Sequence, residues 1–200
     1  MDSCFTINAS GNNSLRVNSS ALIPEPPKPS FLPPPEVPSQ EGPQGILYDF
    51  NHGLRIKFPS GDKKWRLIFM DQDTGTIMFQ GDVKGGDFIC SSKKFFINWR
   101  LEVFQEGKQE PLFIHCLDLY GKPVLINFPD GAIGDTIGWF SYMERFQNKH
   151  HCKLTCAVPQ FAVDLFQKQY PGIELVTRKD NLDFKPYATY YMGLFFRGDT

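Results

Sequence analysis

The chain has 200 residues, of which 21 are basic and 22 acidic, and its formal net charge is −1. This near balance leaves no positive surplus for a polyanion, so the composition argues against nucleic acid as a partner. The first residues lack the positive segment and apolar stretch of a signal peptide, and no apolar run reaches the roughly 18 residues that span a bilayer, so we expect a cytoplasmic protein without a membrane span.

Residues 1–44 contain 9 of the 16 prolines, together with many Ser and Asn residues. Prolines remove backbone hydrogen-bond donors, and the few apolar side chains cannot offset the entropy of ordering such a segment. We therefore expect residues 1–44 to form a disordered tail that is dispensable for folding. A polyproline ligand for an SH3-like partner, which would include Pro33–Pro35, is the alternative.

Residues 45–120 show the pattern of an antiparallel β domain. Apolar side chains alternate with polar or charged ones over 54–58 and 97–103, as expected for strands with one buried face. Asp73–Gly75 and Glu106–Gly107 supply turn residues between such strands. The spacing of these short strands predicts a small antiparallel β-barrel or sandwich.

Residues 121–200 alternate between strand and helix patterns, which predicts a parallel, Rossmann-like sheet. The expected strands are 124–128, 153–158, 173–177 and 188–196, and the expected helices are 136–149 and 159–170. A complete doubly wound domain usually needs about 100–150 residues. We therefore expect a partial domain here, and a fold class that combines α+β and α/β structure.

A glycine-rich turn joins the apolar strand at 124–128 to the helix that follows it. The spacing of Gly131, Gly134 and Gly138 matches neither the dinucleotide motif GxGxxG nor a P-loop. Asp135 is expected at the helix start, where its negative charge would repel a phosphate but not a neutral hydroxyl. An ionised carboxylate can accept the proton of a hydroxyl that attacks as a nucleophile. Local sequence leaves open whether Asp135 is such a base or only an N-cap.

His150, His151 and Cys152, with Cys156 nearby, resemble a metal cluster. On one strand, however, the α-carbons of Cys152 and Cys156 would lie about 13 Å apart, too far to share a zinc ion with bonds of about 2.3 Å. The five cysteines are odd in number and lack framework spacing, which is typical of reduced thiols. We expect buried cysteines and no metal site.

Several segments together carry a resemblance to a known family. They are Gly45–Asn51, Ser91–Phe96, the glycine-rich turn Gly131–Phe140, Glu144–Gln147, Cys152–Cys156 and Pro186–Tyr190. In this chain order they resemble the bacterial autotransporter O-heptosyltransferases, from about residue 45 to the end of the chain. Agreement of so many segments in order is far more specific than any one motif.

The resemblance implies a reaction and a set of site residues. Members of the family transfer heptose from ADP-heptose to serine hydroxyls of autotransporter adhesins in the cytoplasm, and they are similar to the lipopolysaccharide heptosyltransferases. This chain would be the N-terminal part of such a glycosyltransferase, of GT-B type. The comparison implies Asp135 as the catalytic base, and as substrate-binding residues Gly131, Ala132, Gly134 and Thr136. Many relatives carry a hydroxyl residue where Ala132 stands, whereas the Gly134–Asp135 pair is intact.

The resemblance also implies that much of the enzyme lies outside these 200 residues. A second Rossmann domain would hold the donor nucleotide. The family's iron site uses cysteines of the C-terminal half, so no cofactor is expected in this chain. The family forms large rings, which implies a homo-oligomer. We therefore expect the chain alone to be inactive; the alternative is a truncated, non-catalytic binding or assembly module.

Overall fold

Two β-sheets and three α-helices make up the part of the chain that the computed structural model describes, residues 31–92, 96–129, 133–180 and 182–192. The strands are β1 (Gln40–Glu41), β2 (Leu47–Asn51), β3 (Arg55–Lys57), β4 (Lys64–Asp71), β5 (Ile77–Lys84), β6 (Phe88–Cys90), β7 (Trp99–Gln105), β8 (Phe113–Cys116), β9 (Pro123–Asn127), β10 (Lys153–Ala157), β11 (Glu174–Val176) and β12 (Ala188–Tyr191). The helices are α1 (Ile133–Phe140), α2 (Met143–His150) and α3 (Gln160–Phe166), and a 3-10 turn, η1, covers Pro43–Gly45.

The larger sheet has the strand order β11-β10-β9-β12-β2-β3-β6, and β1 pairs with β2 beside this path. Neighbouring strands from β11 to β2 are all parallel, whereas β3 and β6 continue the sheet in antiparallel pairing. Both β9 and β10 are buried except at their first residues, as expected for parallel strands covered on both faces. The result is a mixed α/β fold in which β2, from the N-terminal half of the chain, extends the parallel strands.

The predicted division into a β domain at 45–120 and an α/β domain at 121–200 does not follow sheet membership. Strands β2, β3 and β6 come from the first range but belong to the larger sheet. A separate antiparallel sheet contains β4, β5, β7 and β8, in the order β5-β4-β7-β8. Among the described residues these four strands close no barrel, so the barrel alternative of the predicted barrel or sandwich is not found. Alternation within a strand shows which face is buried but does not identify the partner strand, so the sequence could not reveal this arrangement.

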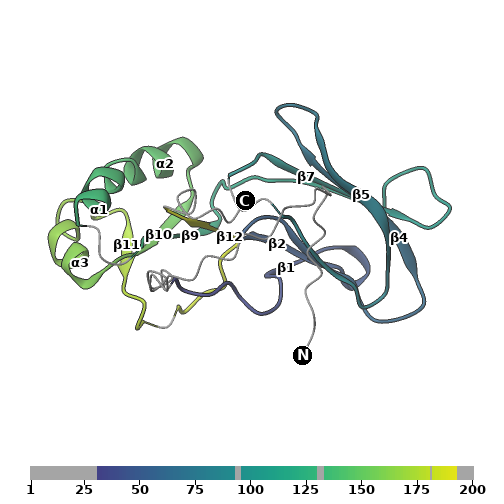
Figure 1. The fold of residues 1–200 in the computed structure, drawn as a ribbon, viewed down its shortest axis with the longest axis horizontal. Coiled ribbons are helices and arrows are strands. Elements are labelled where there is room, and N and C mark those ends of the chain that lie inside the picture. Colours follow the sequence, from purple (N-terminus) through teal and green to yellow (C-terminus); the bar gives the residue numbers. More distant parts are fainter. Residues whose placement is uncertain (1–30, 93–95, 130–132, 181, 193–200) are drawn as a thin grey trace, which may run out of the picture.

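Figure 1 shows the three helices gathered at one end of the molecule, near β9, β10 and β11, and the antiparallel sheet with its long β4–β5 hairpin at the other end. One cluster of buried apolar side chains runs through both parts. Phe58, just after β3, and Trp65, on β4, have ring centroids 4.8 Å apart and join the two sheets. In the described ranges, no helix has the length and apolar character to cross a membrane.

The expected single helix over 136–149 is two helices in the structure. Helix α1 ends at Phe140, and α2 begins at Met143. The hydroxyl of Ser141 donates to the carbonyl oxygen of Gly138 at 3.0 Å. Such local bonds compete with the regular helix, and glycine weakens it further, so both features favour an interruption here.

Residues 31–44 differ from the expected disordered tail, whereas residues 1–30 lie outside the described residues. Strand β1 pairs with β2 in the larger sheet, and the backbone N–H of Leu32 donates to Oδ1 of Asn127 at 3.2 Å. These contacts join the segment to distant parts of the chain, so proline content could not reveal them. Removal of residues 31–44 is therefore expected to destabilise the fold.

Candidate functional site

The carboxyl ends of the parallel strands meet at one edge of the larger sheet. Strand β9 ends at Asn127, β12 at Tyr191 and β2 at Asn51, and these three strands are adjacent in the sheet. Open α/β sheets bind ligands outside this edge. Because Asn51 and Asn127 are fully buried, polar groups reach into the core here. We refer to this region as the carboxyl edge.

Asp135 lies in the first turn of α1, the helix that follows β9, which confirms the position predicted from the glycine-rich turn. The residue is exposed. Gly134 beside it is also exposed, and no heavy atom would lie within 4 Å of a β-carbon added there. The helix dipole favours a negative charge at this end, and an exposed carboxylate can accept a proton from a hydroxyl brought against it. Gly131 and Ala132 lie outside the described residues.

Thr136, the remaining predicted substrate-binding residue, is 0 % exposed, and its Oγ1 has no hydrogen-bond partner among the residues that the structure describes. A buried hydroxyl without a partner typically costs about 1–3 kcal/mol. Native structures retain few such groups, and each calls for an explanation. The burial also means that the Thr136 hydroxyl does not face solvent beside Asp135.

Sequence reasoning does not single out three further polar side chains at the carboxyl edge. The amide of Asn127 contacts the backbone N–H and carbonyl oxygen of Leu32 at 3.2 and 3.4 Å. Tyr191 Oη donates to that same carbonyl oxygen at 3.4 Å. Arg178 Nη2 donates to the carbonyl oxygen of Phe128 at 2.8 Å. Their place in the sequence could have indicated them, because Asn127, Tyr191 and Arg178 each lie at or just beyond the end of a parallel strand.

A buried ion pair lies under this edge. Arg55 Nε and Nη2 donate to Oδ1 and Oδ2 of Asp49 at 2.8 and 2.7 Å, and Asn51 Nδ2 donates to Oδ2 at 2.6 Å. The third nitrogen, Arg55 Nη1, donates to the carbonyl oxygen of Pro35 at 2.8 Å. The alternation over 54–58 predicts that Arg55 faces solvent, but in the structure Arg55 is buried. The paired, bidentate geometry compensates the cost of burying its charge.

Cys152 and Cys156 are buried, and neither forms a disulfide. Burial raises the pKa of both thiols above the ordinary value. Because the thiolate is the form that attacks or binds metal, neither cysteine is suited to either role. This confirms the interpretation of both as buried cysteines. The described part of the chain has no group of three or more His, Cys, Asp or Glu side chains that could hold a metal ion.

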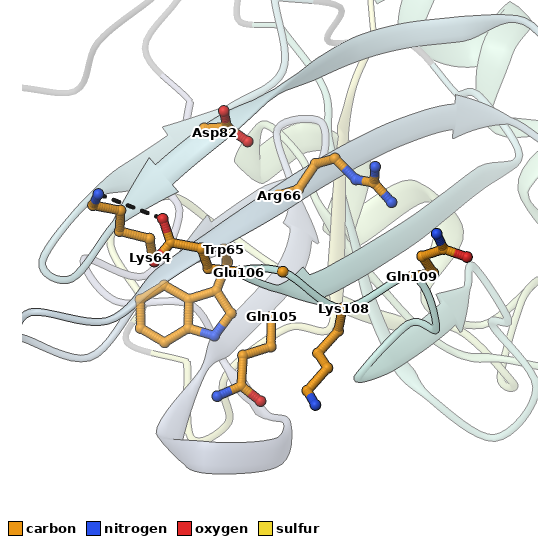
Figure 2. A pocket seen from close by; sticks show the side chains of 9 residues that line it. Lys64, Trp65, Arg66, Asp82, Gln105, Glu106, Lys108 and Gln109 are labelled. Atoms are coloured by element: carbon orange, nitrogen blue, oxygen red, sulfur yellow. Dashed lines mark hydrogen bonds and ion pairs between the residues drawn. The ribbon is translucent and has the colours of Figure 1, made fainter.

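A hollow of about 520 Å³ lies on the antiparallel sheet, and Figure 2 shows the side chains that line it. Its lining includes Lys64, Trp65 and Arg66 of β4 and, across from them, Glu106 and Lys108. Lys64 Nζ lies 3.5 Å from Glu106 Oε1, and both side chains are exposed. The lining therefore mixes both signs of charge, and it offers no carboxylate at a helix start comparable with Asp135.

Comparison with known proteins shows what this chain is similar to. Residues 42–107 match the family model for the glycosyltransferase TibC, N-terminal domain. The chain is 46 % identical over 170 residues to the autotransporter heptosyltransferase TibC of Escherichia coli O78:H11 (strain H10407 / ETEC), a match that covers 85 % of this chain and 41 % of the relative. It is 38 % identical over 165 residues to the inactive autotransporter heptosyltransferase BimC of Burkholderia thailandensis, covering 82 % of this chain and 38 % of that relative.

A solved structure agrees with these matches. The crystal structure of the dodecameric iron-containing heptosyltransferase TibC in complex with ADP-D-beta-D-heptose superimposes with a TM-score of 0.77 and 44 % sequence identity, over 82 % of this chain and 42 % of that chain. The resemblance predicted from the sequence is confirmed. The chain spans about two fifths of the length of the relatives that it matches.

Proposed function

We propose that this chain, which matches the N-terminal part of the autotransporter heptosyltransferase family, forms the acceptor side of a protein O-heptosyltransferase of GT-B type. The observation that carries the proposal is the exposed Asp135 in the first turn of α1, directly after the parallel strand β9. A base is needed where an acceptor hydroxyl becomes the nucleophile. Gly131, Ala132 and Gly134 would surround the acceptor at this turn, and Thr136, whose side chain is buried, would support the turn from beneath.

In the proposed reaction, a serine hydroxyl of an autotransporter adhesin attacks ADP-heptose. The Asp135 carboxylate accepts the hydroxyl proton while the serine oxygen forms a bond to the anomeric carbon. The bond between that carbon and the phosphate oxygen breaks, and ADP leaves with the bonding electrons. Attack from the face opposite the leaving group inverts the anomeric centre. A positioned base of this kind contributes about 10²- to 10⁴-fold to the rate.

The donor would be held largely by residues beyond this chain. A helix N-terminus normally attracts phosphate, but the negative charge of Asp135 opposes a diphosphate at α1. The TibC whose structure contains ADP-D-beta-D-heptose is more than twice as long as the part matched here. We infer a two-domain enzyme with donor and acceptor on opposite sides of a cleft. It would act in the cytoplasm as a homo-oligomer, as the dodecameric TibC suggests.

The test is a chimera in which this chain replaces the matching N-terminal part of TibC, assayed for heptose transfer to an adhesin peptide. We expect Asp135→Asn to keep the fold but lower transfer by about 10²- to 10⁴-fold. Asp164→Asn, at an exposed carboxylate on α3, is the matched control and should retain transfer. The 200-residue chain by itself should show no transfer and no micromolar binding of ADP-heptose. Near wild-type transfer by Asp135→Asn would leave Asp135 only a carboxylate that stabilises the first turn of α1.

A second function, a non-catalytic binding or assembly module, is favoured by one observation. The relative BimC, 38 % identical to this chain, is named an inactive autotransporter heptosyltransferase. A related fold can therefore exist without the activity. The same chimera separates the two functions, because a folded, assembled chimera with an intact Asp135 but no transfer would support the module.

A further inference from the structure

The first described residues cross the carboxyl edge. We define the N-terminal strap as Phe31–Pro35. The amide of Asn127, at the end of β9, contacts both the N–H and the carbonyl oxygen of Leu32, and Tyr191 Oη, at the end of β12, donates to the same carbonyl oxygen. The rings of Phe31 and Tyr191 meet edge to face, with centroids 4.8 Å apart. The strap therefore spans the ends of two adjacent parallel strands.

The strap is also held at its other end. Arg55 Nη1 donates to the carbonyl oxygen of Pro35 at 2.8 Å, while the rest of the guanidinium is engaged by buried Asp49. A few residues later, Ser39 Oγ donates to the carbonyl oxygen of Pro186 at 2.8 Å. Proline rings restrict φ and keep residues 33–35 extended. Moving the strap would break bonds to buried polar groups, so it is a fixed part of this edge.

Arg178 links the strap to Phe128, the residue just after the end of β9. Arg178 donates to the carbonyl oxygen of Phe128, the residue that follows Asn127, and its guanidinium carbon is 5.8 Å from the centroid of the Phe31 ring. The chain then passes from Phe128 to α1 and Asp135. Strap, strand end and base thus belong to one side of the sheet, the side on which α/β folds bind ligands.

We propose that the N-terminal strap is part of the acceptor site, where it forms an apolar wall against which an extended serine-containing polypeptide lies. Phe31 and Leu32 are half-buried and Pro33 is exposed, so the strap offers apolar surface without free N–H groups on its prolines. Both backbone groups of Leu32 are already bonded to side chains. Recognition would therefore depend on shape and apolar contact, with Asn127, Tyr191 and Arg178 as positioning residues. This inference rests on the proposed acceptor function of the edge.

The test measures peptide binding rather than heptose transfer, so its result does not depend on catalytic activity. A synthetic serine-containing adhesin peptide is titrated calorimetrically into the full 200-residue chain, a chain that starts at Phe31 and a chain that starts at Glu36. We expect the first two to bind equally and the third to bind about tenfold more weakly, since loss of a contact residue at an interface has effects of this order.

A point variant keeps the test valid if the shortest chain fails to fold. Phe31→Ala in the full chain removes the ring but leaves every prolyl residue and the Arg55 anchor, and should weaken peptide binding. Phe79→Ala, at a half-buried ring on β5 that packs on Phe69, is the matched control and should not. Thermal unfolding of each variant confirms that it is folded.

Each result of the peptide titrations either supports or overturns the role of the strap in acceptor binding. Equal peptide affinity with and without the strap, tighter binding after its removal, or no peptide binding by the full chain would overturn it. Strap-dependent binding together with no heptose transfer by the TibC chimera would leave this inference standing and refute the proposed catalytic function.

Discussion

The antiparallel sheet and the carboxyl edge are stabilised in different ways. In β4, Trp65, Leu67 and Phe69 are buried, while Lys64 and Arg66 between and beside them are exposed. Apart from the indole N–H of Trp65, which is buried without a hydrogen-bond partner among the described residues, these side chains need only apolar neighbours of suitable size, and several arrangements can supply them. Stability in this region is therefore distributed over many interchangeable contacts.

The carboxyl edge instead contains buried polar groups with specific partners. The Asp49 carboxylate binds Arg55 and Asn51, and Thr189 Oγ1 donates to Asn51 Oδ1 at 2.6 Å across 138 residues of sequence. A buried polar group that loses its partner pays its full desolvation cost. The carboxyl edge therefore tolerates little change in its polar side chains, whereas the antiparallel sheet tolerates substitutions that keep the volume of its apolar side chains.

The largest loss of stability is expected for Asp49→Ala. The change leaves the Arg55 guanidinium buried without its carboxylate, and breaking a buried pair typically costs about 3–5 kcal/mol. Denaturant unfolding of the chain measures the change in the free energy of unfolding. Adding Arg55→Met to the Asp49→Ala variant removes the unpaired charge and should recover part of the loss. A loss below about 1 kcal/mol for Asp49→Ala would contradict the distinction between the two regions.

In the antiparallel sheet, Leu67→Ala tests apolar packing. Leu67 is 0 % exposed, and Leu→Ala changes in a core typically cost about 2–5 kcal/mol. Leu67→Met, which keeps most of the volume, should cost less than about 1.5 kcal/mol. Chemical denaturation of the two variants provides the comparison. If the methionine variant were as unstable as the alanine variant, packing here would be as specific as the polar network.

Thr136→Val sharpens the interpretation of α1. Valine has the shape of threonine without the hydroxyl that lacks a partner, so we expect the free energy of unfolding to stay constant or rise by up to about 1 kcal/mol. Thermal unfolding measures this. A clear fall in the free energy of unfolding would show that the Thr136 hydroxyl has a stabilising partner. In the TibC chimera, a raised KM for the acceptor without any loss of stability would support the proposed role of Thr136 in substrate binding.

The smallest effect is expected for Glu106→Gln, which removes the exposed pair with Lys64. Exposed ion pairs contribute about 0–1 kcal/mol and weaken as salt screens them. Unfolding at low and high salt should show a small difference that disappears at high salt. A loss of several kcal/mol would place this surface pair in the same class as Asp49 and Arg55.

The sequence by itself determined the local elements and the position of the candidate base. Apolar runs and glycine spacing identified β9, the start of α1 and the location of Asp135 in its first turn, because these features depend on residues close together in the chain. Alternation over 97–103 also identified β7 of the antiparallel sheet, whereas the alternation over 54–58 belongs to β3 of the larger sheet. The ordered set of motifs also led to the family that the comparisons support.

Only the tertiary structure decided how these elements are shared between sheets and which polar groups surround the site. The pairing of β2 with β12, the burial of Arg55 against Asp49 and the contact of Leu32 with Asn127 all join residues distant in sequence. Composition classed residues 31–44 as a tail because their prolines and polar residues cannot build a core alone. Their stability comes from partners that the rest of the fold supplies, since a buried polar group keeps its place only when the complete structure brings its partner to it.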